Sequence, residues 1–182
     1  DHIKNGDCSS NLTDWSSLNE GTKATISVDN GRACVKVTGS TPENWHIRLY
    51  HTGLTMDEVE SYTLSFDAWS TNNFSFDVAI RDQTDELYRS FVYEKVTVTS
   101  RLNDSATTFS KTFTPSTTVV SEYGNNTAED GAGQLQFTLG AGALPIGETV
   151  CFDNVKLIEL GGSAPPPPAP PEASVEVNQH GY

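Results

Sequence analysis

Apolar and polar residues alternate at nearly every second position along much of the first 160 residues. This two-residue period is typical of strands that pack one face on a core and turn the other to solvent. Turn signals such as Asp29-Asn30-Gly31 separate the segments, and none of them has the apolar stripe of an amphipathic helix. The pattern therefore predicts an all-β fold, an antiparallel β-sandwich. The strands are expected at residues 24–28, 33–37, 45–51, 62–69, 74–81, 88–91, 108–114, 134–139 and 150–158.

The composition changes sharply near residue 161, where the stretch GGSAPPPPAPPEA holds six of the nine prolines. Such a stretch is typical of a semi-rigid polyproline II spacer, with a disordered tail as the alternative. We favour a linker because the strand-like sequence SVEVNQHGY follows the Pro-rich stretch. The expected organisation is one domain over residues 1–160, a Pro-rich linker over 161–173, and the start of another domain over 174–182 that continues beyond the last residue.

Charge and motifs exclude several classes of function. The chain has 11 Lys and Arg against 24 Asp and Glu, a net charge of −13, which disfavours nucleic acids and anionic membranes as partners. Its polarity comes largely from Ser, Thr and Asn, as in many secreted β proteins. It contains no nucleophile elbow, P-loop or dinucleotide fingerprint. No sequence pattern singles out a pair of carboxylates for glycoside hydrolysis. We therefore expect no catalysis within these residues.

The three cysteines are Cys8, Cys34 and Cys151, and no CxxC pair is present that would indicate a zinc site. Cys34 lies on an early predicted strand and Cys151 on the last. If these strands are neighbours, the pair forms a disulfide, which implies an oxidising compartment; otherwise the two are buried thiols. Cys8 is expected to lie in an opening strand and to act as a small buried apolar residue.

The alternation also predicts which side chains leave the core. In the segment WHIRLYH, the odd positions, Ile47 and Leu49 among them, are expected to face inward, so that His46, Arg48 and Tyr50 share the outer face. Aromatic rings can cover the apolar faces of sugars, while Arg, Gln and His bond their hydroxyls; an ordinary wet sheet face is the alternative. Nearby segments place further candidates outside the core, namely Arg81, Gln83, Tyr88, Gln134 and Thr138. For Gln136 and Thr138, an edge of the sheet is the alternative position.

Three positions suggest a structural cation. Asp7, the turn at Gly31 and Asp153 would converge if the terminal strands pair. Ca²⁺ prefers carboxylate and backbone carbonyl oxygens. Asp is also common in turns, so composition alone leaves this site open.

Several motifs together resemble family 4 carbohydrate-binding modules, the β-jelly-roll modules attached to bacterial cellulases and related glycanases. The resemblance covers about residues 3–158. The motifs that carry it are IKNGDCSSNLTDW, NGRACVKV, WHIRLYHTGLTMDEVESYTLSFDAWS, GQLQFTLG and TVCFDNVKL.

The resemblance implies a jelly roll whose cleft holds a single β-glucan chain. It implies structural Ca²⁺ at the three positions above and a Cys34–Cys151 disulfide. The positions that match ligand-facing ones are Arg48, Tyr50, Tyr88 and Gln134. Arg48 and His51 stand where the family often has Gln, Thr138 where some members have a second Gln, and Glu60 where a turn Gly is usual. These departures leave β-1,4-glucan, mixed-linkage glucan, β-1,3-glucan and xylan open as ligands.

The tail VEVNQHGY resembles the start of the immunoglobulin-like domain that precedes family 9 glycoside hydrolase domains, which favours cellulose-like glucan. The prediction is a secreted, monomeric, non-catalytic module that holds a covalently linked glycoside hydrolase on its polysaccharide. A structural spacer or protein-docking sandwich without sugar binding is the alternative.

Overall fold

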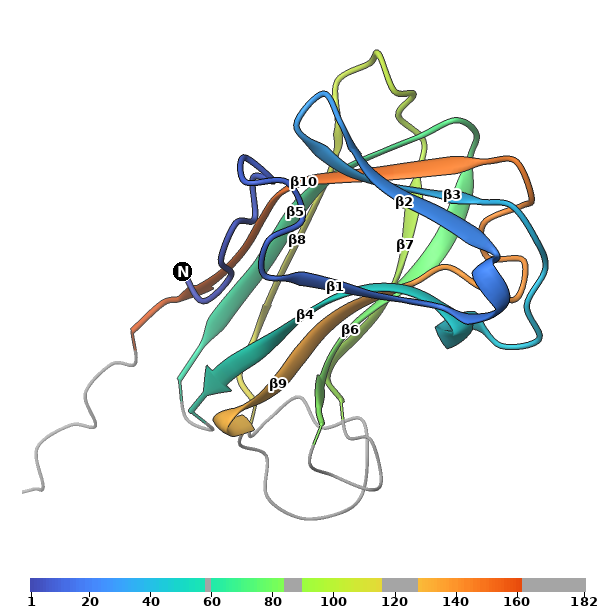
Figure 1. Ribbon diagram of the computed structural model, residues 1–182. Coiled ribbons are helices and arrows are strands. Elements are labelled where there is room, and N and C mark those ends of the chain that lie inside the picture. Colours follow the sequence, from blue (N-terminus) through green and yellow to red (C-terminus); the bar gives the residue numbers. More distant parts are fainter. Residues whose placement is uncertain (58–59, 84–89, 116–127, 162–182) are drawn as a thin grey trace, which may run out of the picture.

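A computed structural model describes residues 1–57, 60–83, 90–115 and 128–161, and of residues 128–132 only the backbone. Two five-stranded sheets face each other in this part of the chain (Figure 1). The strands are β1 (Trp15–Asn19), β2 (Ala24–Asp29), β3 (Arg32–Val37), β4 (Ile47–Met56), β5 (Tyr62–Ser70), β6 (Phe74–Asp82), β7 (Ser90–Val98), β8 (Thr107–Phe113), β9 (Ala128–Thr138) and β10 (Thr149–Glu159). Two short 3-10 helices, η1 (Glu20–Thr22) and η2 (Asn44–His46), complete the elements.

The strand order is β1-β4-β9-β6-β7 in sheet A and β2-β3-β10-β5-β8 in sheet B, and all these pairs are antiparallel. Strands distant in sequence lie side by side, so most contacts are long-range. The predicted β-sandwich is confirmed. Neither of the helices in the described ranges is long and apolar enough to cross a membrane.

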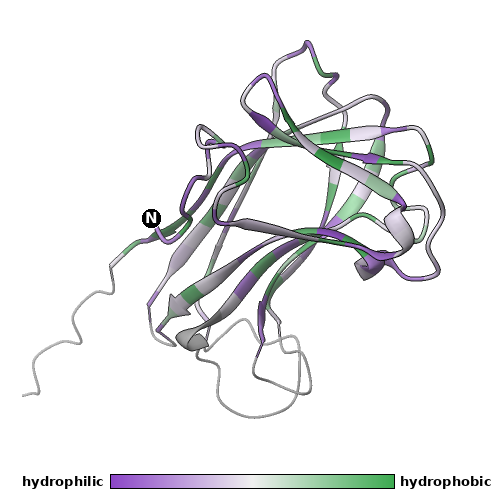
Figure 2. Cartoon of the chain, in the orientation of Figure 1, coloured by the Kyte–Doolittle hydropathy of each residue, from purple (hydrophilic) through white to green (hydrophobic). Residues whose placement is uncertain are grey.

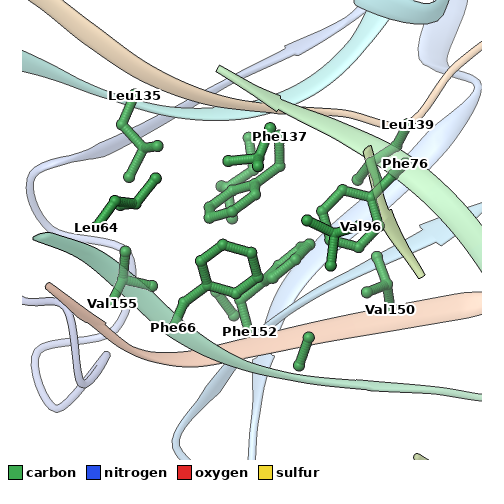
Figure 3. Packing of buried hydrophobic residues seen from close by; sticks show 14 of the residues in the cluster. Leu64, Phe66, Phe76, Val96, Leu135, Phe137, Leu139, Val150, Phe152 and Val155 are labelled. Carbon is green, nitrogen blue, oxygen red and sulfur yellow. The ribbon is translucent and has the colours of Figure 1, made fainter. Parts of the chain in front are cut away.

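The core lies between the two sheets and is built around four phenylalanines, one from each of four strands (Figure 3). Phe137 of β9 stacks on Phe152 of β10 with ring centroids 4.2 Å apart. Phe66 of β5 meets Phe137 edge-on at 5.0 Å, and Phe76 of β6 meets Phe152 edge-on at 5.3 Å. Figure 2 shows the alternation of apolar and polar positions along the strands that feeds this core.

The segment before β1 is fixed by close contact with β10. The Val155 N–H donates to the carbonyl of Gly6 at 2.9 Å, and a Cβ at Gly6 would lie 1.9 Å from the Val155 oxygen. Only glycine permits this approach. The neighbouring Asn5 side chain holds the following loop through bonds to Ser10, Asn11 and Thr13. The N-G-D opening is therefore a backbone-packing motif.

The expected disulfide between Cys34 and Cys151 is confirmed. The two residues pair directly across β3 and β10 with their Cα atoms 4.0 Å apart, so the bond joins neighbouring strands of sheet B. Cys151 also pairs with Trp69 of β5, and the Arg32 guanidinium lies 4.0 Å from the Trp69 ring centroid. Cys8 is a buried free thiol, as expected, but lies in the turns before β1.

Candidate functional site

The outer face of sheet A carries a polar surface that spans β4, β9, β6 and β7. Strand register sets its residues in rows across the sheet. Gln134 and Arg81 form one row across β9 and β6. The other two rows are Arg48, Thr138, Asp77 and Lys95, followed by Tyr50, Gln136, Ala79 and Tyr93.

A cleft of about 390 Å³ opens over this face. Four of the predicted site residues line it, namely Arg48, Arg81, Gln83 and Gln134. The other lining residues are Trp45, Asp82 and Gln136. The cleft therefore combines one indole ring, two guanidinium groups, three amides and one carboxyl group, a set that offers both an apolar face and many hydrogen-bonding groups.

Arg48 contacts two neighbours on the outer face of sheet A, Gln136 and Tyr50. Its guanidinium donates to Oε1 of Gln136 at 3.3 Å and lies 5.2 Å from the centroid of the Tyr50 ring. Gln136 is fully buried, and its Nε2 has no hydrogen-bond partner in the described part of the chain. A buried amide donor without an acceptor is costly, so an acceptor supplied from the cleft would be stabilising.

The predicted placement of His46 on the outer face of a strand is wrong. His46 lies in η2, buried, with its Nε2 3.2 Å from Oε2 of Glu20, and it does not line the cleft. Its ring instead meets the Trp45 ring edge-on at 4.1 Å. Strand alternation fails here because the strand begins only at Ile47, after the 3-10 turn.

Trp45 is the aromatic residue that the alternation missed. An odd position in the segment, it was expected to face inward, yet it is 44% exposed and lines the cleft. The backbone turn at η2 swings its side chain out of the pattern that Ile47 and Leu49 follow. The available signal was its place directly before the strand, after the turn-like TPEN.

Of the remaining predicted site residues, Tyr50 and Thr138 do not line the cleft in the described part of the chain. Tyr50 is half-buried on the outer face of sheet A beneath Arg48. Thr138 lies on the same face but is buried, and its hydroxyl donates to the carbonyl of Asp77 at 3.2 Å. Tyr88 lies outside the described residues. Gln136, which the sequence left between this face and an edge, belongs to the floor of the cleft.

Two of the three predicted calcium positions, Gly31 and Asp153, lie close together on sheet B. Phe152 pairs with Ala33, which brings the neighbouring Asp153 close to the β2–β3 turn at Gly31. Burial raises the pKa of Asp153, and the charges of Asp67 and Asp7 add to this rise. No group of three His, Cys, Asp or Glu side chains within the described ranges is arranged to hold a metal. Carboxylate and backbone carbonyl oxygens are the ligand types that Ca²⁺ prefers, and Asp7, Asp153 and the carbonyl of Gly31 are of these types.

Comparisons with known proteins agree with this fold. The sequence model of a family described as "Carbohydrate binding domain" matches residues 1–122. Endoglucanase C of Cellulomonas fimi is 30% identical over 167 residues, which are 89% of this chain and 13% of that protein. The chain thus spans only a small part of that relative.

Two solved structures show the same fold. One, titled "CBM4 structure and function", has a TM-score of 0.64 at 20% identity and covers 84% of this chain and 99% of its own. The second N-terminal cellulose-binding domain of Cellulomonas fimi β-1,4-glucanase C has a TM-score of 0.61 at 22% identity and covers 90% and 95%. With a family match over two thirds of its length, this chain belongs to the carbohydrate binding domain family, and it resembles the family 4 modules in both sequence and fold.

Proposed function

We propose that this carbohydrate-binding module binds single β-glucan chains along the outer face of sheet A. Its preferred ligand would be a cellulose-like β-1,4-glucan. The observation that carries the proposal is the cleft, in which the exposed Trp45 ring stands beside Arg48 and Gln136. A ring covers the apolar face of a glucose unit, and the guanidinium and amide groups bond its hydroxyls. The cellulose-binding domains named among the structural neighbours support this ligand class.

The role of such binding is to raise local concentration. A module tethered to a glycoside hydrolase would keep that enzyme on its polysaccharide, because the second encounter becomes intramolecular. The module itself would do no chemistry. We further propose that the protein works outside the cell as a monomer, and its Cys34–Cys151 disulfide is consistent with an oxidising compartment.

We also propose that Ca²⁺ binds at Asp7, Asp153 and the carbonyl of Gly31. Bound there, the ion would supply positive charge to two carboxylates that otherwise repel each other. The Asp7 and Asp153 side chains would hold it, and it would tie the segment before β1 to β10. It lies on sheet B, so its role would be stability and not ligand binding.

Affinity electrophoresis tests the proposed function. The chain is run through native gels that contain barley β-glucan, hydroxyethylcellulose, laminarin or xylan. We expect retardation by the first two, which would name the ligand class. Arg48→Ala should lose most of this retardation, while Lys36→Ala, which removes an exposed cation from sheet B, should keep it. A folded chain that no gel retards would indicate a spacer or protein-docking sandwich.

A further inference from the structure

Tyr93 is an exposed ring that the cleft does not include. Four large apolar or aromatic side chains in the described ranges are markedly exposed, and only Trp45 and Tyr93 of these belong to the outer face of sheet A. Tyr93 is 43% exposed. It pairs across β6–β7 with Ala79. The Ala79 side chain is only a methyl group, so it rises little above the sheet beside the Tyr93 ring. The ring thus stands at the β7 side of the same face, beyond the cleft.

The Tyr93 ring is anchored by a buried carboxylate. Its hydroxyl donates to Oδ2 of Asp77 at 3.0 Å, and Asp77 is only 9% exposed. The same oxygen accepts from Nδ2 of Asn44 at 3.0 Å, and Lys95 Nζ lies 3.1 Å from the other oxygen. Hydrogen bonds to a carboxylate are stronger than those between neutral groups, so this network fixes its members firmly.

Asp77 therefore connects two segments that carry exposed aromatic rings. Asn44 immediately precedes Trp45 in η2, and Tyr93 lies on β7, so a single carboxylate contacts both sides of the face. A ring that is already ordered loses little conformational freedom when a ligand covers it. Burial and the bond to Asp77 raise the pKa of Tyr93, which keeps its hydroxyl protonated and able to donate.

We propose that Tyr93 forms a second aromatic contact for the bound glycan, beyond the cleft, and that Asp77 is the positioning residue that holds its ring in place. This inference rests on the proposed function and extends its binding face from β4 and η2 to β7. The ligand is the same β-glucan chain. The face then presents Trp45 and Tyr93 to separate sugar units of one chain, with the polar floor between them.

A double-mutant cycle on the full chain tests the proposal, with barley β-glucan as the probe and affinity measured by gel retardation. Tyr93→Ala should weaken binding about five-fold, the usual effect of one aromatic contact. Tyr93→Phe keeps the ring but loses its anchor and should weaken binding about two-fold. Asp77→Ala should weaken it at least as much, and Asp77→Ala with Tyr93→Phe no more than Asp77→Ala alone.

The controls separate positioning from general damage. Lys36→Ala removes an exposed cation from sheet B and should bind like the wild type. If Asp77→Ala does not fold, the affinities of Tyr93→Ala and Tyr93→Phe are compared with that of Lys36→Ala. Wild-type affinity in Tyr93→Ala, or losses that add in the double variant, would overturn the inference. A wild-type chain that binds no glucan would instead count against the proposed function.

Discussion

Replacing Trp45 with Ala measures how much one exposed ring contributes to glycan binding. The residue is 44% exposed, which is about 110 Å² if a whole Trp presents about 250 Å². A sugar stacked on one face would cover roughly half of that, about 55 Å². At about 25 cal/mol per Å², the lost burial amounts to about 1.4 kcal/mol, or a tenfold rise in Kd.

Isothermal titration calorimetry with cellohexaose is the direct assay. Trp45→Phe should fall between the wild type and Trp45→Ala, because a smaller ring still covers part of a sugar face. Ile146→Ala is the matched control, since it removes an exposed apolar side chain that is 63% exposed and does not line the cleft. Its affinity should equal that of the wild type.

Stability must be followed in the same samples. The covered part of Trp45 packs edge-on against His46, so the Ala variant also loses stability, by about 2 kcal/mol. Circular dichroism at the titration temperature shows whether it remains folded. A folded Trp45→Ala protein that binds cellohexaose within two-fold of the wild type would refute the assignment of this ring to the site.

Three further expectations concern stability. Replacing Cys34 and Cys151 together by Ala should lower the free energy of unfolding in urea by up to about 5 kcal/mol, the chain entropy of a loop closed over 117 residues; a loss below about 1 kcal/mol would contradict this. Burial lowers the pKa of His51, whose Nε2 accepts from the Lys4 N–H at 3.1 Å, so its contribution is complete above about pH 6.5 and is lost as the pH falls through the lowered folded-state value. The urea midpoint should therefore drop on acidification, and less steeply in His51→Gln. Chelation of Ca²⁺ should lower the Tm of the wild type but not of Asp153→Asn, with cellohexaose affinity unchanged in both. An unaltered wild-type Tm would contradict the proposed calcium site.

The alternation of side chains predicted the core well because the period-2 rule is local. Ile47, Leu49, Leu135 and Phe137 are all buried between the sheets, as the pattern indicates. Each of these follows from its neighbours in one strand, with no knowledge of what the strand packs against. The same rule correctly placed Arg48 and Gln134 on the opposite face.

The rule was wrong where backbone geometry changes or where a strand lacks the pattern. β1 was not predicted because its sequence, WSSLN, holds only two apolar residues. The strand is held by its pairing with β4 at one edge of sheet A, which the sequence pattern does not reveal. Trp45 and His46 sit in a 3-10 turn, where alternation does not apply. Asp77 lies on the outer face of β6, and its contacts with Asn44 and Tyr93 join three separate elements. Only the sheet order reveals these contacts.

Sheet A shows where stability and binding separate in this fold. Its inner face buries phenylalanines against sheet B, and this packing accounts for a stable sandwich. Its outer face buries polar groups as well, including a fully buried Gln136 whose Nε2 has no partner in the described chain. An apolar side chain there would cost less, because a buried amide without a partner carries a desolvation penalty. A glycan hydroxyl bound in the proposed site would offer an acceptor to this face, so the cost of burying the amide is consistent with a binding role.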